Sequence, residues 1–133
     1  MSLFNVFGIA GSGMSAQSVR LNLTASNIAN SESVAGSPDQ AYKARHPIFQ
    51  AVLDKSMNAS VRTAGVVEDK KDGEMRYEPN HPMADDKGYV YSSNVDPVEE
   101  MANMISASRS FEQNVEVMNT TKQLLMRTLR LGE

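Results

Sequence analysis

The sequence contains no cysteine and no tryptophan, and its aromatic residues are four phenylalanines and four tyrosines. The absence of cysteine excludes disulfides, thiolate zinc sites, iron–sulfur clusters and cysteine nucleophiles. Because large rings are few, the interior must be filled by aliphatic residues and nine methionines, whose flexible side chains fit irregular gaps without specifying one packing. A chain of this length is expected to form one domain with a thin core.

Long apolar runs and clusters of one charge are also missing. The 16 acidic and 13 basic residues are spread along the chain, so no basic stripe indicates nucleic-acid binding. No apolar segment approaches the ~20 residues that span a bilayer, and we expect no membrane insertion. The first basic residue is Arg20, so the charged leading region of a cleaved signal peptide is missing. If the protein leaves the cytoplasm, a route without a cleaved signal must carry it.

Residue patterns typical of catalysis are not found. His46 and His81 are the only histidines, and each precedes a proline, which favours extended loop geometry. His81 could be drawn as a metal ligand with Asp85 and Asp86, but a loop spacing fixes no geometry and no second cluster completes the ligand set. No phosphate-binding glycine loop or nucleophile elbow occurs. We therefore expect no catalytic residue, no metal and no cofactor, and a small metal-dependent enzyme is an alternative that bound metal would reveal.

The N-terminal segment, from Leu3 to about Asn30, has no proline and predicts a helix. Its apolar stripe alternates steps of four and three residues, the seam spacing of a coiled coil: Leu3, Phe7, Ala10, Met14, Gln17, Leu21, Thr24 and Ile28. Three glycines lie in its first half, and each costs about 1 kcal/mol relative to alanine in a helix interior. This helix should therefore need a neighbour to become stable.

The C-terminal segment, from Asp96 to about Leu131, predicts a longer helix with clear end signals. Asp96 is a capping residue, Pro97 suits the first helical position, and Gly132 suits the end. The stripe of this helix again has steps of three and four: Met101, Met104, Ser108, Phe111, Val115, Met118, Lys122, Leu125 and Leu129. Since the two stripes match, they predict that the terminal helices pair as an antiparallel coiled coil.

Apolar residues also lie outside this seam, on both flanks of the C-terminal helix. Val117, Leu124 and Leu131 share one flank, and Met126 lies on the other. A two-helix seam covers only a narrow stripe, so a monomer would leave these side chains in water. Helices of other subunits would bury them, and contacts that repeat head to tail without closing produce a helical filament.

The middle of the chain, residues 31–95, predicts a small, loop-rich β region. Short strands are expected at Tyr42–Arg45, Ile48–Val52, Val61–Val67, Met75–Tyr77 and Tyr89–Ser92. Hairpin-type turns are expected at Lys71-Asp72-Gly73 and at Asp86-Lys87-Gly88. The predicted fold class is α+β, with a helical domain from 1–30 and 96–133 and a β domain from 31–95.

Several short sequence motifs give a more specific indication of the family. They are Ala25-Ser26-Asn27-Ile28-Ala29-Asn30, Ala41-Tyr42-Lys43-Ala44, His81-Pro82-Met83-Ala84-Asp85, Gly88-Tyr89-Val90, Asn94-Val95-Asp96, Glu99-Glu100-Met101, Ile105 to Phe111, Asn114, and Asn119 to Lys122. In this order, the motifs resemble those of the flagellar rod, hook and filament axial family, and of its proximal-rod members in particular. The resemblance covers nearly the whole chain. The loop after Asn30 is longer and more polar than is usual in that family.

The resemblance implies a structural subunit of the periplasm-spanning basal-body rod, exported by the flagellar type III apparatus without a cleaved signal. It implies an inner layer of paired terminal helices and an outer β region. Implied partners are copies of the chain, other proximal and distal rod proteins, the hook-basal adaptor protein and the export apparatus. The residues expected to carry assembly are Leu3, Phe7, Met14, Leu21, Asn27, Ile28, Asn30, Met101, Met104, Arg109, Phe111, Val115, Met118, Leu124, Leu125 and Leu129.

Some of these residues also have simpler interpretations. The asparagines that end the first helix could serve only as C-terminal caps. Arg109 could be a solvated helix residue, or it could contact a carboxylate or carbonyl of a neighbouring subunit. For the whole chain, the alternative function is a helical-hairpin adaptor or export chaperone of the flagellar secretion system.

Overall fold

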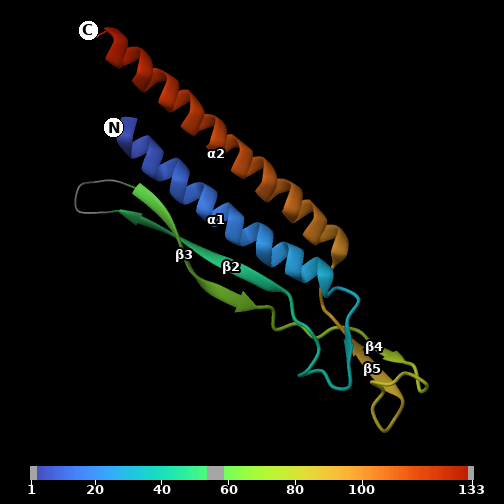
Figure 1. Ribbon diagram of the computed structural model, residues 1–133. Helices are drawn as coiled ribbons and strands as arrows, with labels where there is room; N and C mark the ends of the chain where they lie inside the picture. The colour runs from blue at the N-terminus through green and yellow to red at the C-terminus, as the bar shows by residue number, and fades with distance from the viewer. Residues whose placement is uncertain (1–2, 54–58, 132–133) are drawn as a thin grey trace. The chain divides into compact units, whose positions relative to one another are not determined.

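The computed structural model describes residues 3–53 and 59–131. In chain order the elements are α1 (Leu3–Ala29), β1 (Val34–Ala35), β2 (Arg45–Leu53), β3 (Ala59–Glu68), β4 (Met75–Tyr77), β5 (Tyr89–Ser92) and α2 (Pro97–Leu131) (Figure 1). The terminal helices pack together, and the short antiparallel strands lie between them in the sequence. The predicted α+β class is confirmed.

Both helices begin and end close to their predicted bounds. The Asp96 carboxylate accepts hydrogen bonds from the backbone N–H of Val98 at 2.9 Å and of Glu99 at 3.2 Å. These bonds satisfy amides that have no partner inside the helix, so Asp96 is the N-cap of α2 as predicted. The expected stop at Gly132 lies outside the described residues.

The strands agree with the predictions in four of five cases. The exception is Tyr42–Arg45, of which only Arg45 lies in a strand, while β1 falls in a segment that was expected to be a polar loop. The turn at Lys71-Asp72-Gly73 does not close a hairpin, because β3 pairs with β2 and β4 pairs with β5. The prediction of a hairpin there was wrong, since spacing alone does not tell which strands become partners.

The three-stranded sheet has the order β1-β5-β4 and is antiparallel. Val90 of β5 pairs with Arg76 of β4 and is fully buried. Gly88, just before β5, has a φ of +82°, a conformation that glycine adopts at little cost. The turn predicted at Asp86-Lys87-Gly88 is therefore confirmed.

Contacts group the chain into two compact units. The first unit contains residues 1–21, 47–65 and 105–133, and the second contains residues 22–46 and 66–104. Each unit thus takes a part of both helices and of the β2–β3 pair. All four phenylalanines belong to the first unit and all four tyrosines to the second. The expected division into a helical domain and a β domain stays a prediction.

The buried apolar residues of the described chain are small. They are Ala10, Ala16, Ala35, Ala41, Ala44, Val90, Val95 and Ala107. No leucine, isoleucine, methionine or phenylalanine in the described part is fully buried. Close approach of backbones therefore replaces the packing of large side chains, and the core is thin, as the composition predicts.

Candidate assembly interface

Asn27, near the end of α1, lies at the centre of the second unit and is completely buried. Its Nδ2 donates to the backbone oxygen of Arg45 at 2.9 Å and to Oε2 of Glu100 at 3.0 Å. Its Oδ1 accepts from the Tyr42 hydroxyl at 3.0 Å and from the Arg45 backbone N–H at 2.9 Å. Both donors and both acceptor positions of the amide are occupied. Asn27 therefore joins α1, α2 and the start of β2 through one side chain.

The neighbours of Asn27 are held by further polar contacts. The Glu100 side chain has only 3% of its surface exposed, and its Oε1 accepts from Asn103 Nδ2 at 3.4 Å. Burial raises the pKa of the Tyr42 hydroxyl, so this group stays protonated and able to donate. The Arg45 guanidinium lies 5.6 Å from the centre of the Tyr42 ring and pairs with Glu68 at 3.1 Å. The group is thus a connected polar network.

A second asparagine fixes the loops beside this network. Asn94 Oδ1 accepts from the backbone N–H of Ala44 at 2.7 Å, and Asn94 Nδ2 donates to the backbone oxygen of Lys71 at 2.6 Å. These bonds tie the end of β5 to two separate loops of the second unit. The motif Asn94-Val95-Asp96 thus contains one residue that holds two loops, Asn94, and one that caps α2, Asp96.

The most buried residues of α2 repeat every seven positions: Glu100, Ala107 and Thr121 are buried, and Asn114 is half-buried. Met104, Phe111, Met118 and Leu125 form a second, half-buried series with the same spacing. The sequence had assigned Met101, Ser108, Val115, Lys122 and Leu129 to the first series, one position later. That assignment was wrong for Met101, Lys122 and Leu129, which are exposed.

The reason is that the polar residues of this series satisfy their own hydrogen bonds. Thr121 Oγ1 donates to the backbone oxygen of Val117 at 2.7 Å, and Asn114 Nδ2 donates to that of Ser110 at 2.9 Å. A polar group that already has a partner costs little to bury. Apolarity alone therefore misplaced the seam, and the exact seven-residue spacing of these polar positions was the signal that could have found it.

Within the first unit, α1 and α2 run side by side in opposite directions (Figure 1). Gly13 faces Asn114, since a Cβ at residue 13 would lie 3.0 Å from Asn114 Nδ2. Two residues earlier, a Cβ at Gly11 would lie 3.9 Å from the Met118 methyl group. On α1, Ser12 Oγ accepts from the backbone N–H of Val61 in β3 at 3.0 Å. Small residues of α1 thus allow α2 and β3 to approach closely.

The other predicted assembly residues divide by exposure. Leu3, Phe7, Met14, Leu21, Ile28, Asn30, Met104, Phe111, Val115, Met118 and Leu125 are half-buried, and Met101, Arg109, Leu124 and Leu129 are exposed. Asn30 caps α1, since its Nδ2 donates to the Ser26 oxygen at 2.8 Å. The capping interpretation therefore suits Asn30 and does not suit Asn27. A role of these residues between subunits stays a prediction.

Apolar side chains remain uncovered along the outer surface of α2. Leu124 is 47% exposed, Leu129 is 67% exposed and Leu131 is 87% exposed. Val117, Leu124 and Leu131 recur every seven residues and so lie on one flank. Val98, Met101 and Ile105 form a similar exposed group near the start of the helix. An isolated subunit thus presents hydrophobic surface to water over much of α2.

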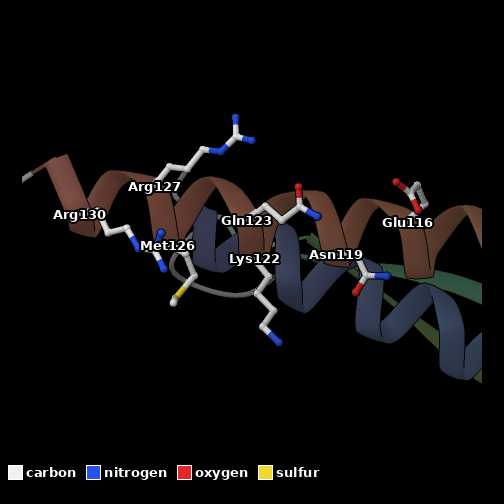
Figure 2. Close-up of a pocket in the computed structure, with 7 residues that line it drawn as sticks. All are labelled: Glu116, Asn119, Lys122, Gln123, Met126, Arg127 and Arg130. Carbon is white, nitrogen blue, oxygen red and sulfur yellow. The ribbon is translucent and has the colours of Figure 1, made fainter.

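A polar, basic face lies on the C-terminal half of the same helix (Figure 2). A shallow hollow of about 550 Å³ is lined there by Glu116, Asn119, Lys122, Gln123, Met126, Arg127 and Arg130. From residue 117 to 131 the helix carries three cations and no carboxylate. Among the described residues the ion pairs involve Lys43, Arg45 and Arg76, and none of them involves these three cations.

Two of the three residues that could be drawn as metal ligands from the sequence, His81 and Asp85, accept backbone hydrogen bonds instead. His81 Nδ1 accepts from the Met83 backbone N–H at 3.0 Å. Asp85 Oδ1 accepts from the N–H of Tyr89 and of Lys87, each at 2.9 Å, and the bond from Tyr89 is the main reason that the pKa of Asp85 is lowered. Across residues 3–53 and 59–131, no cluster of three or more potential ligands could hold a metal ion.

Neither α1 nor α2 combines the length and hydrophobicity needed to cross a membrane.

Comparison with known proteins places the chain in a family. Residues 7–36 match the family described as flagella basal body rod protein, and residues 86–131 match the one described as flagellar basal body rod FlgEFG protein C-terminal. The chain is 49% identical over 134 residues to the flagellar basal-body rod protein FlgC of Yersinia enterocolitica, with all of both chains covered. The same protein of Salmonella typhimurium is 46% identical, again with both chains fully covered. The chain therefore belongs to the family of the flagellar basal-body rod protein FlgC.

Proposed function

We propose that this structural subunit of the flagellar basal-body rod assembles through its terminal helices, which pair as an antiparallel coiled coil. The observation that carries the proposal is the row of exposed apolar side chains at Val117, Leu124 and Leu131. Burial of a leucine side chain contributes about 1.5–3 kcal/mol, so packing against neighbouring helices would stabilise a stack of subunits. We infer that the chain has a mechanical role and no catalytic one.

The coiled-coil assignment is supported by the seven-residue spacing of the buried series on α2. Asn27 lies within hydrogen-bonding distance of Glu100 in the second unit, and Gly13 lies against Asn114 in the first. A polar contact at a seam position typically specifies register, because a shifted pair would leave buried polar groups without partners. The Asn27–Glu100 contact would therefore fix the register of the helices, the small Gly13 would allow their close approach, and the apolar flanks would be left for other subunits.

The thin core supports assembly of a subunit that is only marginally ordered on its own. An interior built mainly of alanine buries little apolar area per residue, so much of the stabilisation would come from neighbours. Passage through the type III export apparatus without a cleaved signal, and a final place in the periplasm-spanning rod, are consistent with such a chain. Other proximal and distal rod proteins and the hook-basal adaptor protein are the expected partners.

A paired substitution tests the role of the flank. Leu124→Asp places a charge on the exposed flank, whereas Leu125→Asp places it on the half-buried seam. We expect both variants to stop rod assembly and motility, with helicity of the isolated chain reduced by Leu125→Asp alone. Ser15→Asp, at an exposed position on α1, is the matched control and should swim. Normal swimming of the Leu124→Asp strain would refute the assembly role of the flank.

A second experiment separates a rod subunit from an adaptor or chaperone. A rod subunit is retained in purified basal bodies, whereas a chaperone stays in the cytoplasm. We expect the chain in the basal-body fraction, and we expect its helicity by circular dichroism to rise when other rod subunits are added. Full helicity of the dilute, isolated chain would contradict the proposed dependence on neighbours.

A further inference from the structure

The two units of the chain carry opposite net charge. The first unit has seven basic and four acidic residues, and the second has six basic and twelve acidic residues. Their formal net charges are thus +3 and −6. The overall charge of −3 conceals this polarity, which the composition alone did not reveal.

Three of the seven basic residues of the first unit lie on one face of α2. Figure 2 shows Lys122, Arg127 and Arg130 around the hollow on the last turns of the helix, with Met126 between them. All three cations are exposed, and only Glu116 at the far end of the hollow is acidic. Because Met126 and the aliphatic stems of the cations lie together, this basic face can bury some hydrophobic area while its charges meet carboxylates.

A complementary surface is present in the second unit of the same chain. A hollow of about 620 Å³ near the start of α2 is lined by the exposed carboxylates of Glu32, Asp72, Glu74 and Asp96, with Lys71 and Arg76 as its cations. Val95 and Pro97 add apolar lining. Asp72 pairs with Lys43 and Asp96 caps α2, so Glu32 and Glu74 are the carboxylates left for a partner. This acidic groove thus opposes the basic face in charge and resembles it in mixing charged with apolar groups.

We propose that the basic face of one copy docks on the acidic groove of a second copy. This inference rests on the proposed function and names the partner of its assembly surface. Since each copy would use its first unit toward one neighbour and its second unit toward the other, the contact is heterologous, the kind that links copies head to tail into a ring or a filament. The charge polarity would also exclude head-to-head pairing, because like-charged surfaces repel.

Complementary charge reversal tests the docking. One variant carries Arg127→Glu and Arg130→Glu, and the other carries Glu32→Lys and Glu74→Lys. All four side chains are exposed, and none takes part in the ion pairs of the described residues. Each variant alone should self-associate about tenfold or more weakly than the wild type, measured by sedimentation at about 50 mM salt. An equimolar mixture should recover association, because each reversed surface then meets its complement. Such recovery cannot arise from misfolded variants.

The control is Arg62→Glu, a charge change on β3 within the same unit, which should associate like the wild type. Raising the salt to about 500 mM should weaken wild-type association, because screening shortens the range of exposed charges. Unchanged self-association of either reversed variant, or a mixture that stays monomeric, overturns the proposal. Binding of the basic face to other rod subunits with no self-association would also overturn it.

The same strains distinguish this inference from the proposed function. If both reversed variants enter basal bodies and support swimming, the docking fails while the rod role stands. If the wild-type chain itself is missing from purified basal bodies, the rod role fails. Loss of swimming in each variant, with recovery when the two are expressed together, supports the docking.

Discussion

Replacement of Asn27 by alanine removes an amide whose four hydrogen bonds all lie inside the second unit. The Arg45 backbone N–H and the Glu100 carboxylate would lose a partner away from bulk water. Each unsatisfied buried group costs about 1–3 kcal/mol. We therefore expect the free energy of unfolding of this unit to fall by about 2–5 kcal/mol, a large share of the ~5–15 kcal/mol typical of a domain.

The placement of the tyrosines provides a fluorescence assay for the unfolding of this unit. All four tyrosines lie in the second unit and the chain has no tryptophan, so intrinsic fluorescence reports this unit alone. Urea titration followed by tyrosine fluorescence should give a lower midpoint for Asn27→Ala than for the wild type. Asn22→Ala is the matched control, since Asn22 is exposed on the same helix, and its effect should stay within about 0.5 kcal/mol.

Two results would refute this reasoning. One is a midpoint of Asn27→Ala equal to that of Asn22→Ala, because the buried amide would then contribute nothing measurable. The other is a wild-type chain without a cooperative transition in the tyrosine signal, because the network would then not form in the isolated subunit.

Two further predictions concern the seam and the β4–β5 connection. Gly13→Val should lower the helicity and melting temperature measured by circular dichroism, because the valine side chain would meet the Asn114 amide. Gly8→Ala, with open space around it, should raise helicity through a gain of about 1 kcal/mol. A stabilising Gly13→Val would contradict the close approach of the helices. The N–H of Tyr89 lowers the pKa of Asp85, so the ionised carboxylate stabilises the fold above the ordinary value of 3.8, and this contribution is lost as the pH falls through the lower folded-state value. The urea midpoint should therefore drop less between about pH 5 and about pH 2 in Asp85→Asn than in the wild type, and equal drops would count against this role of Asp85.

The helix ends were predictable from sequence because their signals are local. Asp96 caps α2 through bonds to amides two and three residues away, so its role depends only on neighbouring residues. Gly88 adopts its positive φ within a turn of a few residues for the same reason. Such features need no knowledge of the rest of the chain.

The centre of the second unit was not predictable in the same way. Asn27 is surrounded by residues that are 15 to 73 positions away in the sequence. Its neighbours include Glu100, a carboxylate that composition alone would place in water. Only the fold reveals that these polar groups satisfy one another, so a rule that buries apolar residues misses both.

The alanine-rich interior has a consequence for the proposed export and assembly of the subunit. Alanine has no side-chain rotamers to lose when a chain becomes ordered, in contrast to leucine or methionine. Residues such as Ala10, Ala16 and Ala107 therefore lose little conformational entropy when the chain folds, and their small side chains also contribute little to the free energy of unfolding. If the proposed export route is used, such a chain could convert between unfolded and folded forms with a small free-energy difference, and contacts with neighbouring subunits would then supply most of the stability of the assembled form.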